Sequence, residues 1–274
     1  MTMQPESFHK LTEWAQFFNE TEIPVLHRTA SDLATLREQE PSPSPRNVAR
    51  IIRRDPLMTV KLLRHLQKHK HKRQQQEIVQ VEQALIMLGV ENALDQVNAK
   101  PLVQHLLRQH PATLVNLLQR IHWAHIASNY ALEWAIRLYD THFEEIRIAA
   151  LLHDITEMLL HCFVPNKMLE IDTLQRQDST LRSANIQKTV LGFTIHSLQA
   201  ALIEAWELPE LLIMLMDKKH ITHPRIRNVA LAIDLARHSS HGWDNAALPD
   251  DYAAIGELLH ITPDDAKTLV NAHS

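Results

Sequence analysis

Apolar side chains recur three and four residues apart along most of the chain, which is the spacing of helices that bury one face. Leu11, Trp14, Ala15 and Phe18 show this pattern within a helix that we expect at residues 8–18. The same periodicity predicts helices over residues 31–39, 78–88, 93–109, 113–139, 144–163, 187–190, 196–206, 210–220, 225–238, 252–260 and 263–272. Two further helices are expected to begin at Pro45 and Pro56, because proline favours the first helical position.

The composition favours an all-α fold. The chain of 274 residues has only four glycines and an aromatic fraction of 5%, whereas Leu, Ala, Ile, Gln and Glu dominate. Thirteen prolines punctuate the predicted helices. Short connections between helices indicate a bundle, and the length suits one domain or two small lobes. We therefore expect a two-lobed helical bundle, with lobes at residues 1–110 and 111–274.

Charge and cysteine content narrow the class of protein. A net charge of −4, with histidines neutral, gives no overall attraction to nucleic acid or anionic lipid. Cys162 is the only cysteine, which excludes an internal disulfide and suits a reducing compartment. The amino terminus lacks a secretory signal, and no apolar run has the roughly 20 residues that a membrane helix needs. We expect a cytoplasmic protein with neither a membrane nor nucleic acid as partner.

Residues 68–76 form a basic stretch that is rich in His and Gln and has no apolar side chain. Clustered basic groups can attract phosphates, and His69 and His71 can bind a metal adventitiously. The alternative is a solvated loop, which is the commoner role of such a run. No aromatic residue interleaves with it, so stacking on bases is not indicated.

The segment from Ala149 to Ile155 combines five small or apolar residues with His153 and Asp154. Burying a histidine beside an aspartate is costly unless each side chain has a partner. A divalent metal can take both as ligands, and hydrogen bonds to neighbouring helices can also satisfy them. Both interpretations stay open on this dipeptide alone.

Other polar side chains fall on predicted helices that are otherwise apolar. They are His125, His196, His220 and Asp234, the last within the apolar run at residues 229–233. Histidines and aspartates from successive helices can converge on one site in the core of a bundle. The sequence thus indicates a candidate metal centre.

Several ordered segments carry a resemblance to a known family. They are Ile23-Pro24-Val25-Leu26, Ile51-Ile52-x-x-Asp55-Pro56-Leu57, Ala84-Leu85-x-x-Leu88-Gly89, Trp123-x-His125, Ala150-Leu151-Leu152-His153-Asp154-Ile155, Gly192-x-x-x-His196 and Trp206-x-Leu208-Pro209-Glu210. The set resembles the HDOD family, a branch of the HD superfamily of metal-dependent phosphohydrolases, across nearly the whole chain. The resemblance implies an HD-like helical domain in the carboxy-terminal half.

The resemblance also implies a ligand set. His125, His153, Asp154 and Asp234 match the positions that hold the first metal in catalytic HD relatives. His196 and His220 match histidines that help to hold a second metal. The resemblance thus implies one or two divalent ions, of Fe, Mn, Mg, Zn or Ni, as the cofactor. The alternative is that this chain binds no metal.

The chain departs from the catalytic pattern in three respects. Catalytic HD-GYP relatives have a lysine where this chain has Glu157, and a glutamate there repels phosphate. The usual paired histidines appear here as Lys219 and His220, and no Gly-Tyr-Pro tripeptide is present. HDOD proteins resemble degraded hydrolases that act in signalling. We therefore expect a regulator that binds a partner protein, with a nucleotide ligand or a homo-oligomer as further options.

An active hydrolase is the competing hypothesis. His153, Asp154 and Glu157 form a His-Asp-x-x-Glu pattern that resembles HD-type nucleotidases, in which the glutamate assists water activation. Glu157 would then be the catalytic residue of a metal-dependent phosphohydrolase acting on nucleotides or cyclic nucleotides. Glu157 can also be a solvent-facing helix residue. A plain helical scaffold without metal is the third hypothesis.

Overall fold

The computed structural model describes residues 8, 10–40, 42–69, 77–178 and 181–271, and helices make up most of them. Among these residues, β-type pairing is limited to an isolated bridge between Val25 and Leu102. The all-α prediction is confirmed. The chain forms two units, Met1–Ile121 with Asp154–Leu208 and His122–His153 with Pro209–Ser274. The predicted boundary at residue 110 differs from this division, because residues 154–208 return to the first unit.

Unit 1 contains the amino-terminal helices and a second group from the middle of the chain. Its helices are α1 (Leu11–Glu20), α2 (His27–Gln39), α3 (Pro45–Ile52), α4 (Pro56–Lys68), α5 (Val81–Leu88), α6 (Val90–Gln96), α7 (Val103–Leu106), the first part of α8 (Pro111–Arg137), α10 (Ile155–Phe163), α11 (Pro165–Gln177), α12 (Ser183–Leu191) and α13 (Ile195–Ala205).

Two predicted helix starts in unit 1 are confirmed with their capping residues. Ser44 accepts a hydrogen bond from the backbone N–H of Asn47 at the start of α3. Asp55 is fully buried and accepts from the backbone N–H groups of Leu57 and Met58 at the start of α4. It also accepts from the N–H of Leu26, at 2.8 Å. Asp55 therefore fastens the Ile23-Pro24-Val25-Leu26 segment to the start of α4.

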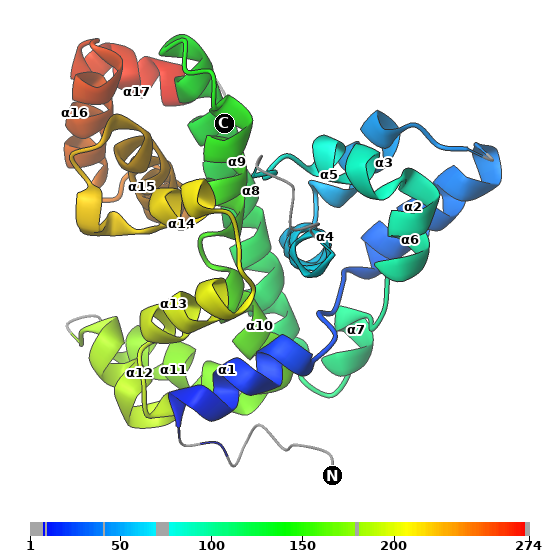
Figure 1. Cartoon of the computed structure of the whole chain (residues 1–274). Coiled ribbons are helices and arrows are strands. Elements are labelled where there is room, and N and C mark those ends of the chain that lie inside the picture. The colour runs from blue at the N-terminus through cyan, green and yellow to red at the C-terminus, as the bar shows by residue number, and fades with distance from the viewer. Residues whose placement is uncertain (1–7, 9, 41, 70–76, 179–180, 272–274) are drawn as a thin grey trace. The chain divides into compact units, whose positions relative to one another are not determined.

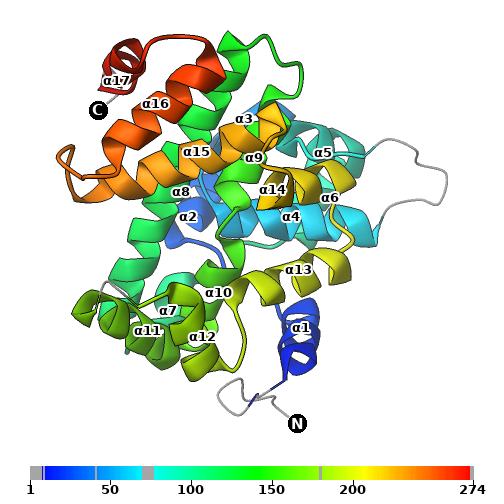
Figure 2. The same cartoon turned by 90° about the vertical axis from the view of Figure 1, so that its left-hand side faces the viewer.

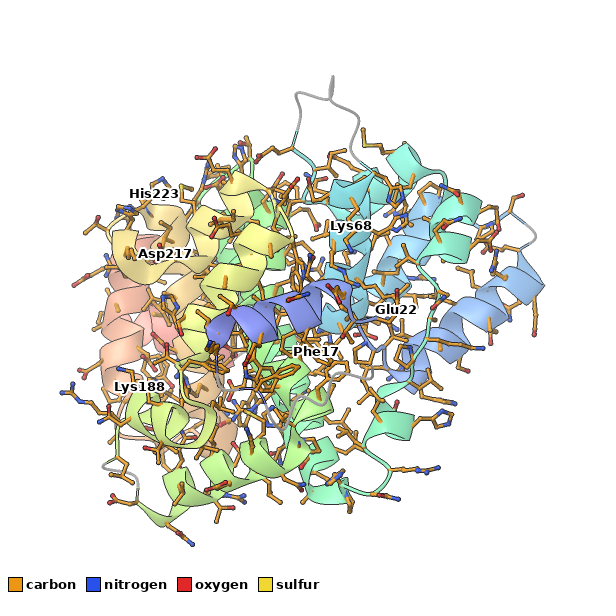
Figure 3. The ribbon with its side chains drawn as sticks, turned by 60° about the horizontal axis from the view of Figure 1, so that its bottom comes forward. Phe17, Glu22, Lys68, Lys188, Asp217 and His223 are labelled. Carbon is orange, nitrogen blue, oxygen red and sulfur yellow. The ribbon has the colours of Figure 1, made fainter. Side chains whose placement is uncertain are left out.

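Aromatic side chains hold α1 to the rest of unit 1. Trp14 lies with its ring centroid 5.8 Å from that of Phe193, and Phe17 lies 5.3 Å from Phe163. Edge-to-face pairs at these separations stabilise a core beyond the area that they bury. Figures 1 and 2 show α1 beside α13, and Figure 3 labels Phe17 on α1. The apolar face predicted for this helix is therefore its packed face.

Unit 2 is built around α15. Its elements are the second part of α8, α9 (Phe143–Leu152), α14 (Glu210–Met216), the 3-10 turn η2 (Lys218–His220), α15 (Pro224–His238), the 3-10 turn η3 (Ser239–His241), α16 (Leu248–Leu259) and α17 (Pro263–Asn271). Helix α15 packs against α9, α14 and α16, and α16 packs against α17 (Figure 2). The apolar run at residues 229–233 supplies buried side chains to this core, among them Val229, Ala232 and Ile233.

Two of the longer predicted helices are interrupted in the structure, and the helix predicted at residues 210–220 ends at Met216, before the 3-10 turn η2. The helix predicted at residues 144–163 is divided into α9 and α10, with His153 and Asp154 between them. The helix predicted at residues 93–109 is replaced by α6, a segment with a cis Lys100–Pro101 bond, and α7. Pro101 has no N–H and cannot continue a helix, so this second break was readable from the sequence.

Two further expectations concern the basic stretch and the membrane. Most of the basic stretch, at residues 70–76, lies outside the described residues, and α4 ends at Lys68, the first residue of that stretch. No described helix by itself has the length and apolar character to cross a bilayer. The segments Phe143–Phe163 and Pro165–Gln177 meet that test only as a pair bent by 118°.

Candidate functional site

The junction of α9 and α10 positions the His153-Asp154 pair. His153 follows the last residue of α9, and Asp154 is the N-cap residue of α10, with a backbone φ of −100° that leaves the helical path. The buried side chains of Leu152 and Ile155 hold the junction on either side. His153 and Asp154 are themselves half-buried. The polar pair thus occupies the break between two helices that both bury apolar side chains.

Three more predicted ligands belong to unit 2. His125 is half-buried on α8, whereas His220 is exposed at the end of η2. Asp234 is on α15, and its Oδ1 accepts a hydrogen bond from Nη2 of Arg237 at 2.5 Å. Asp234 is therefore already neutralised by a cation one helical turn away. In unit 1, His196 is exposed at the second position of α13.

Glu157 is held by a neighbour that the sequence patterns did not indicate. Its Oε1 lies 3.0 Å from Nη2 of Arg120, and both side chains are less than a fifth exposed. The same Nη2 donates to Oδ1 of Asp172, also at 3.0 Å. Glu157 is thus paired and largely buried rather than solvent-facing, and its catalytic role stays a prediction.

Two other side chains complete this group, which we call the Arg120 cluster: Arg120, Glu157, Asp172, Asn116 and His161. Asn116 donates from Nδ2 to Oδ2 of Asp172 at 2.7 Å. His161 is fully buried, with Nδ1 2.8 Å from the backbone oxygen of Glu157 and Nε2 3.4 Å from Oδ2 of Asp172. Both of these oxygens can only accept, so the imidazole can serve both when it carries two protons. The cluster joins α8, α10 and α11.

The charges in the cluster compensate one another. Burial opposes the charge of Arg120, but the carboxylates of Glu157, Asp172 and Asp154 outweigh it and raise the pKa of the guanidinium. Burial also opposes the charge of Asp172, yet His161, Arg120 and Asn116 together lower the pKa of its carboxyl. Arg120 is therefore a permanent cation beside the carboxylates of both Asp154 and Glu157.

The structure does not gather the predicted ligands into a metal site within either unit. Over the described parts of the chain, no group of three or more His, Cys, Asp or Glu side chains is placed to hold an ion. A divalent ion at Asp154 would also meet the positive charge of Arg120. The six-residue ligand set stays a prediction, because its members are divided between the two units.

Arg120, Asn116, Asp172 and His161 are the polar residues of the cluster that sequence reasoning missed. His161 lies among the buried residues Leu159, Leu160 and Cys162, and it shares a helix face with Glu157, four residues earlier. That spacing was a usable signal for a buried polar pair. Arg120 and Asp172 are 52 residues apart, and no local pattern connects them.

Solved structures share the fold. A response regulator, MmoQ from Methylococcus capsulatus, is 17% identical with a TM-score of 0.66, over 92% of this chain and 99% of that one. A virulence factor from Campylobacter jejuni is 21% identical with a TM-score of 0.66, over 98% and 92%. An HDOD domain protein of unknown function from Geobacter sulfurreducens is 16% identical with a TM-score of 0.50, over 96% and 93%.

Sequence comparisons place the chain in a family. Comparison with curated proteins finds no significant match. The family model of the HDOD domain, however, matches residues 23–222. That range includes the Asp55 contacts, the His153-Asp154 junction and the Arg120 cluster. It covers well over half of the chain, and the protein therefore belongs to the HDOD domain family.

Proposed function

We propose that this HDOD protein is a regulator that acts by binding a partner protein in a signalling pathway and performs no hydrolysis at the His153-Asp154 junction. The observation that carries the proposal is the ion pair between Arg120 and Glu157. A general base must be able to accept a proton from water in reach of the substrate. The Glu157 carboxylate is turned toward the buried guanidinium of Arg120 instead.

The charge of Arg120 supports the same conclusion for metal binding. Hydrolysis in HD enzymes depends on a divalent ion, which polarises phosphate and activates water. Here the Arg120 charge is close enough to Asp154 to be stabilised by it. The fixed positive charge of Arg120 beside the expected ligand Asp154 disfavours a bound metal ion. The proposed function does not need a metal ion.

A metal-dependent phosphohydrolase is the second candidate. The observation that favours it is the placement of His153 and Asp154 at a helix junction, half-buried and so within reach of a small substrate. This function would require Glu157 to leave Arg120 before it could act as a base. It would also require the predicted ligands of the two units to meet around the ion.

Metal analysis and a hydrolysis screen separate the two candidates. Protein purified without an affinity tag is analysed for metal, then incubated with nucleotides and cyclic nucleotides in the presence of Mn²⁺. The proposal predicts no stoichiometric metal and no turnover above the level of Asp154→Ala. Asp264→Ala, an exposed aspartate on α17, is the matched control. Stoichiometric metal with turnover lost only in Asp154→Ala would establish the hydrolase.

The partner part of the proposal has its own test. Because binding needs no turnover, cross-linking in cells should capture the same protein with the wild-type chain and with Asp154→Ala. The purified partner should then bind both chains with equal affinity in a titration. A partner that dissociates when Asp154 is replaced would instead tie recognition to the junction.

A further inference from the structure

A pocket of about 360 Å³ lies within unit 2, and none of the predicted metal ligands lines it. It is lined by the turn that follows α8, the first turns of α15 and the end of α16. His223, labelled in Figure 3, immediately precedes the part of α15 that lines it. The volume is within the range of sites that bind small molecules.

Two ion pairs form the polar walls of the pocket. Nε of Arg225 donates to Oδ2 of Asp140 at 2.6 Å, and Nη2 of Arg227 donates to Oε2 of Glu257. Burial opposes the charge of Asp140, but the hydrogen bond and the charge of Arg225 lower the pKa of its carboxyl. The two arginines and the two carboxylates cancel, so the walls carry no net charge. A dianion such as a phosphate monoester would meet two carboxylates here.

The pocket residue Asn228 has an acceptor without a partner. Asn228 is 1% exposed, and its Nδ2 donates to the backbone oxygen of Ala131 at 3.2 Å, which fixes the orientation of the amide. Its Oδ1 is buried and has no hydrogen-bond partner in the described structure. Leaving a buried acceptor unsatisfied costs free energy, so a ligand group that reaches it with an N–H is favoured at this point.

Arg225 offers the complementary groups. Its guanidinium contacts Asp140 through Nε, and no described residue accepts from its two Nη groups. Arg225 and Asn228 are three residues apart on α15 and so share a helix face, with Cβ atoms roughly 5–6 Å apart. The apolar side chains of Leu138, Ile146 and Leu258 line the same pocket.

We propose that this pocket binds a free aliphatic L-amino acid. The ligand carboxylate accepts from the Nη groups of Arg225, the ammonium donates to Oδ1 of Asn228 and to Asp140, and the side chain packs on Leu138, Ile146 and Leu258. A zwitterion matches walls without net charge. Its carboxylate is the acceptor and its ammonium is the donor, and both are attached to the same α-carbon. The site goes beyond the proposed function, and its failure would leave that function unaffected.

Calorimetric titration of the full chain with single L-amino acids tests the site. We expect one leucine-sized aliphatic amino acid to bind per chain. Isocaproate lacks the ammonium and leucinol lacks the carboxylate, so each should bind at least about tenfold more weakly, which is about 1.4 kcal/mol. No binding by any amino acid would overturn the proposal. Isocaproate or inorganic phosphate binding as tightly as leucine would overturn it equally.

Two variants test the location without relying on Asn228, whose replacement could disturb folding. Arg225→Gln keeps a polar side chain but loses the charged donors, and it should weaken leucine binding at least about tenfold. Leu138→Trp fills the pocket and should abolish binding. Arg50→Gln, an exposed arginine of unit 1, is the control and should bind as the wild type does. Circular dichroism checks that each variant folds. Unchanged affinity in folded Leu138→Trp would contradict the assignment.

Discussion

The Arg120 cluster of unit 1 and the Arg225 pocket of unit 2 both pair an arginine with carboxylates. The two arginines differ in the number of carboxylates that they contact and in what lies beside them. In the cluster one nitrogen of Arg120 contacts two carboxylates, those of Glu157 and Asp172. In the pocket Arg225 contacts one carboxylate through Nε and borders an open volume. A buried guanidinium shared by two carboxylates therefore stabilises the fold. A guanidinium with spare donors beside a cavity can instead bind a ligand.

Replacing Arg120 should have the largest effect on stability. Arg120→Met leaves Glu157 and Asp172 with unpaired, largely buried negative charges, and loss of one partner from such a pair costs about 3–5 kcal/mol. The free energy of unfolding from urea denaturation measures this loss. A cost below about 1 kcal/mol would show that the cluster is solvated and would remove the contrast with the pocket.

Replacing Asp172 tests the electrostatics of the cluster through pH. The folded-state pKa of Asp172 is lowered, so its contribution to stability is present above its unfolded pKa of about 4 and is lost as pH falls below it. Asp172→Asn should cost about 1.5–3 kcal/mol near neutral pH, and its difference from the wild type should shrink in acid. A difference that stays constant down to low pH would contradict the ion pairing.

Replacing Arg225 should have a smaller effect than replacing Arg120. Arg225→Gln removes one hydrogen bond to Asp140, whose side chain is less buried than that of Asp172, and Asp140 keeps its bond from the N–H of His142. We expect a loss of about 1 kcal/mol in the free energy of unfolding. A cost equal to that of Arg120→Met would mean that the pocket arginine is also structural.

An exposed arginine calibrates the comparison. Arg37 contacts Glu91 and Asp95 at 2.9 and 2.7 Å, but all three side chains are more than two-fifths exposed. Arg37→Gln should cost between about 0.2 and 1 kcal/mol, and high salt should reduce even that. Because Arg37 also contacts two carboxylates, a loss as large as that of Arg120 would show that the number of partners, rather than burial, sets the effect.

Local patterns predicted the parts of the fold that local forces determine. Ser44-Pro45 and Asp55-Pro56 indicated helix starts, because capping and proline chemistry act within one turn. The apolar stripes of α1 and α15 indicated their packed faces. The division of residues 144–163 into α9 and α10 was missed, because His153 and Asp154 interrupt the helix without a proline or glycine to announce it.

The candidate site was predictable only in part, for a physical reason. Polar residues amid apolar runs located the His153-Asp154 junction, because burial of such groups demands partners. The partners themselves come from distant segments, as with Arg120 and Glu157, and no spacing rule connects them. The pocket of unit 2 was not anticipated at all, because Asp140, Arg225 and Glu257 are unremarkable surface-type residues until the fold brings them together.

A double-mutant cycle between Arg120 and Glu157 tests directly whether Arg120 holds the Glu157 carboxylate. Unfolding free energies of the wild type, Arg120→Met, Glu157→Gln and the double variant give the coupling between the two side chains. If Glu157 is held by Arg120, the coupling should be about 1.5–3 kcal/mol, the range of a charged hydrogen bond. A coupling near zero would leave Glu157 free to act as a base and would contradict the account.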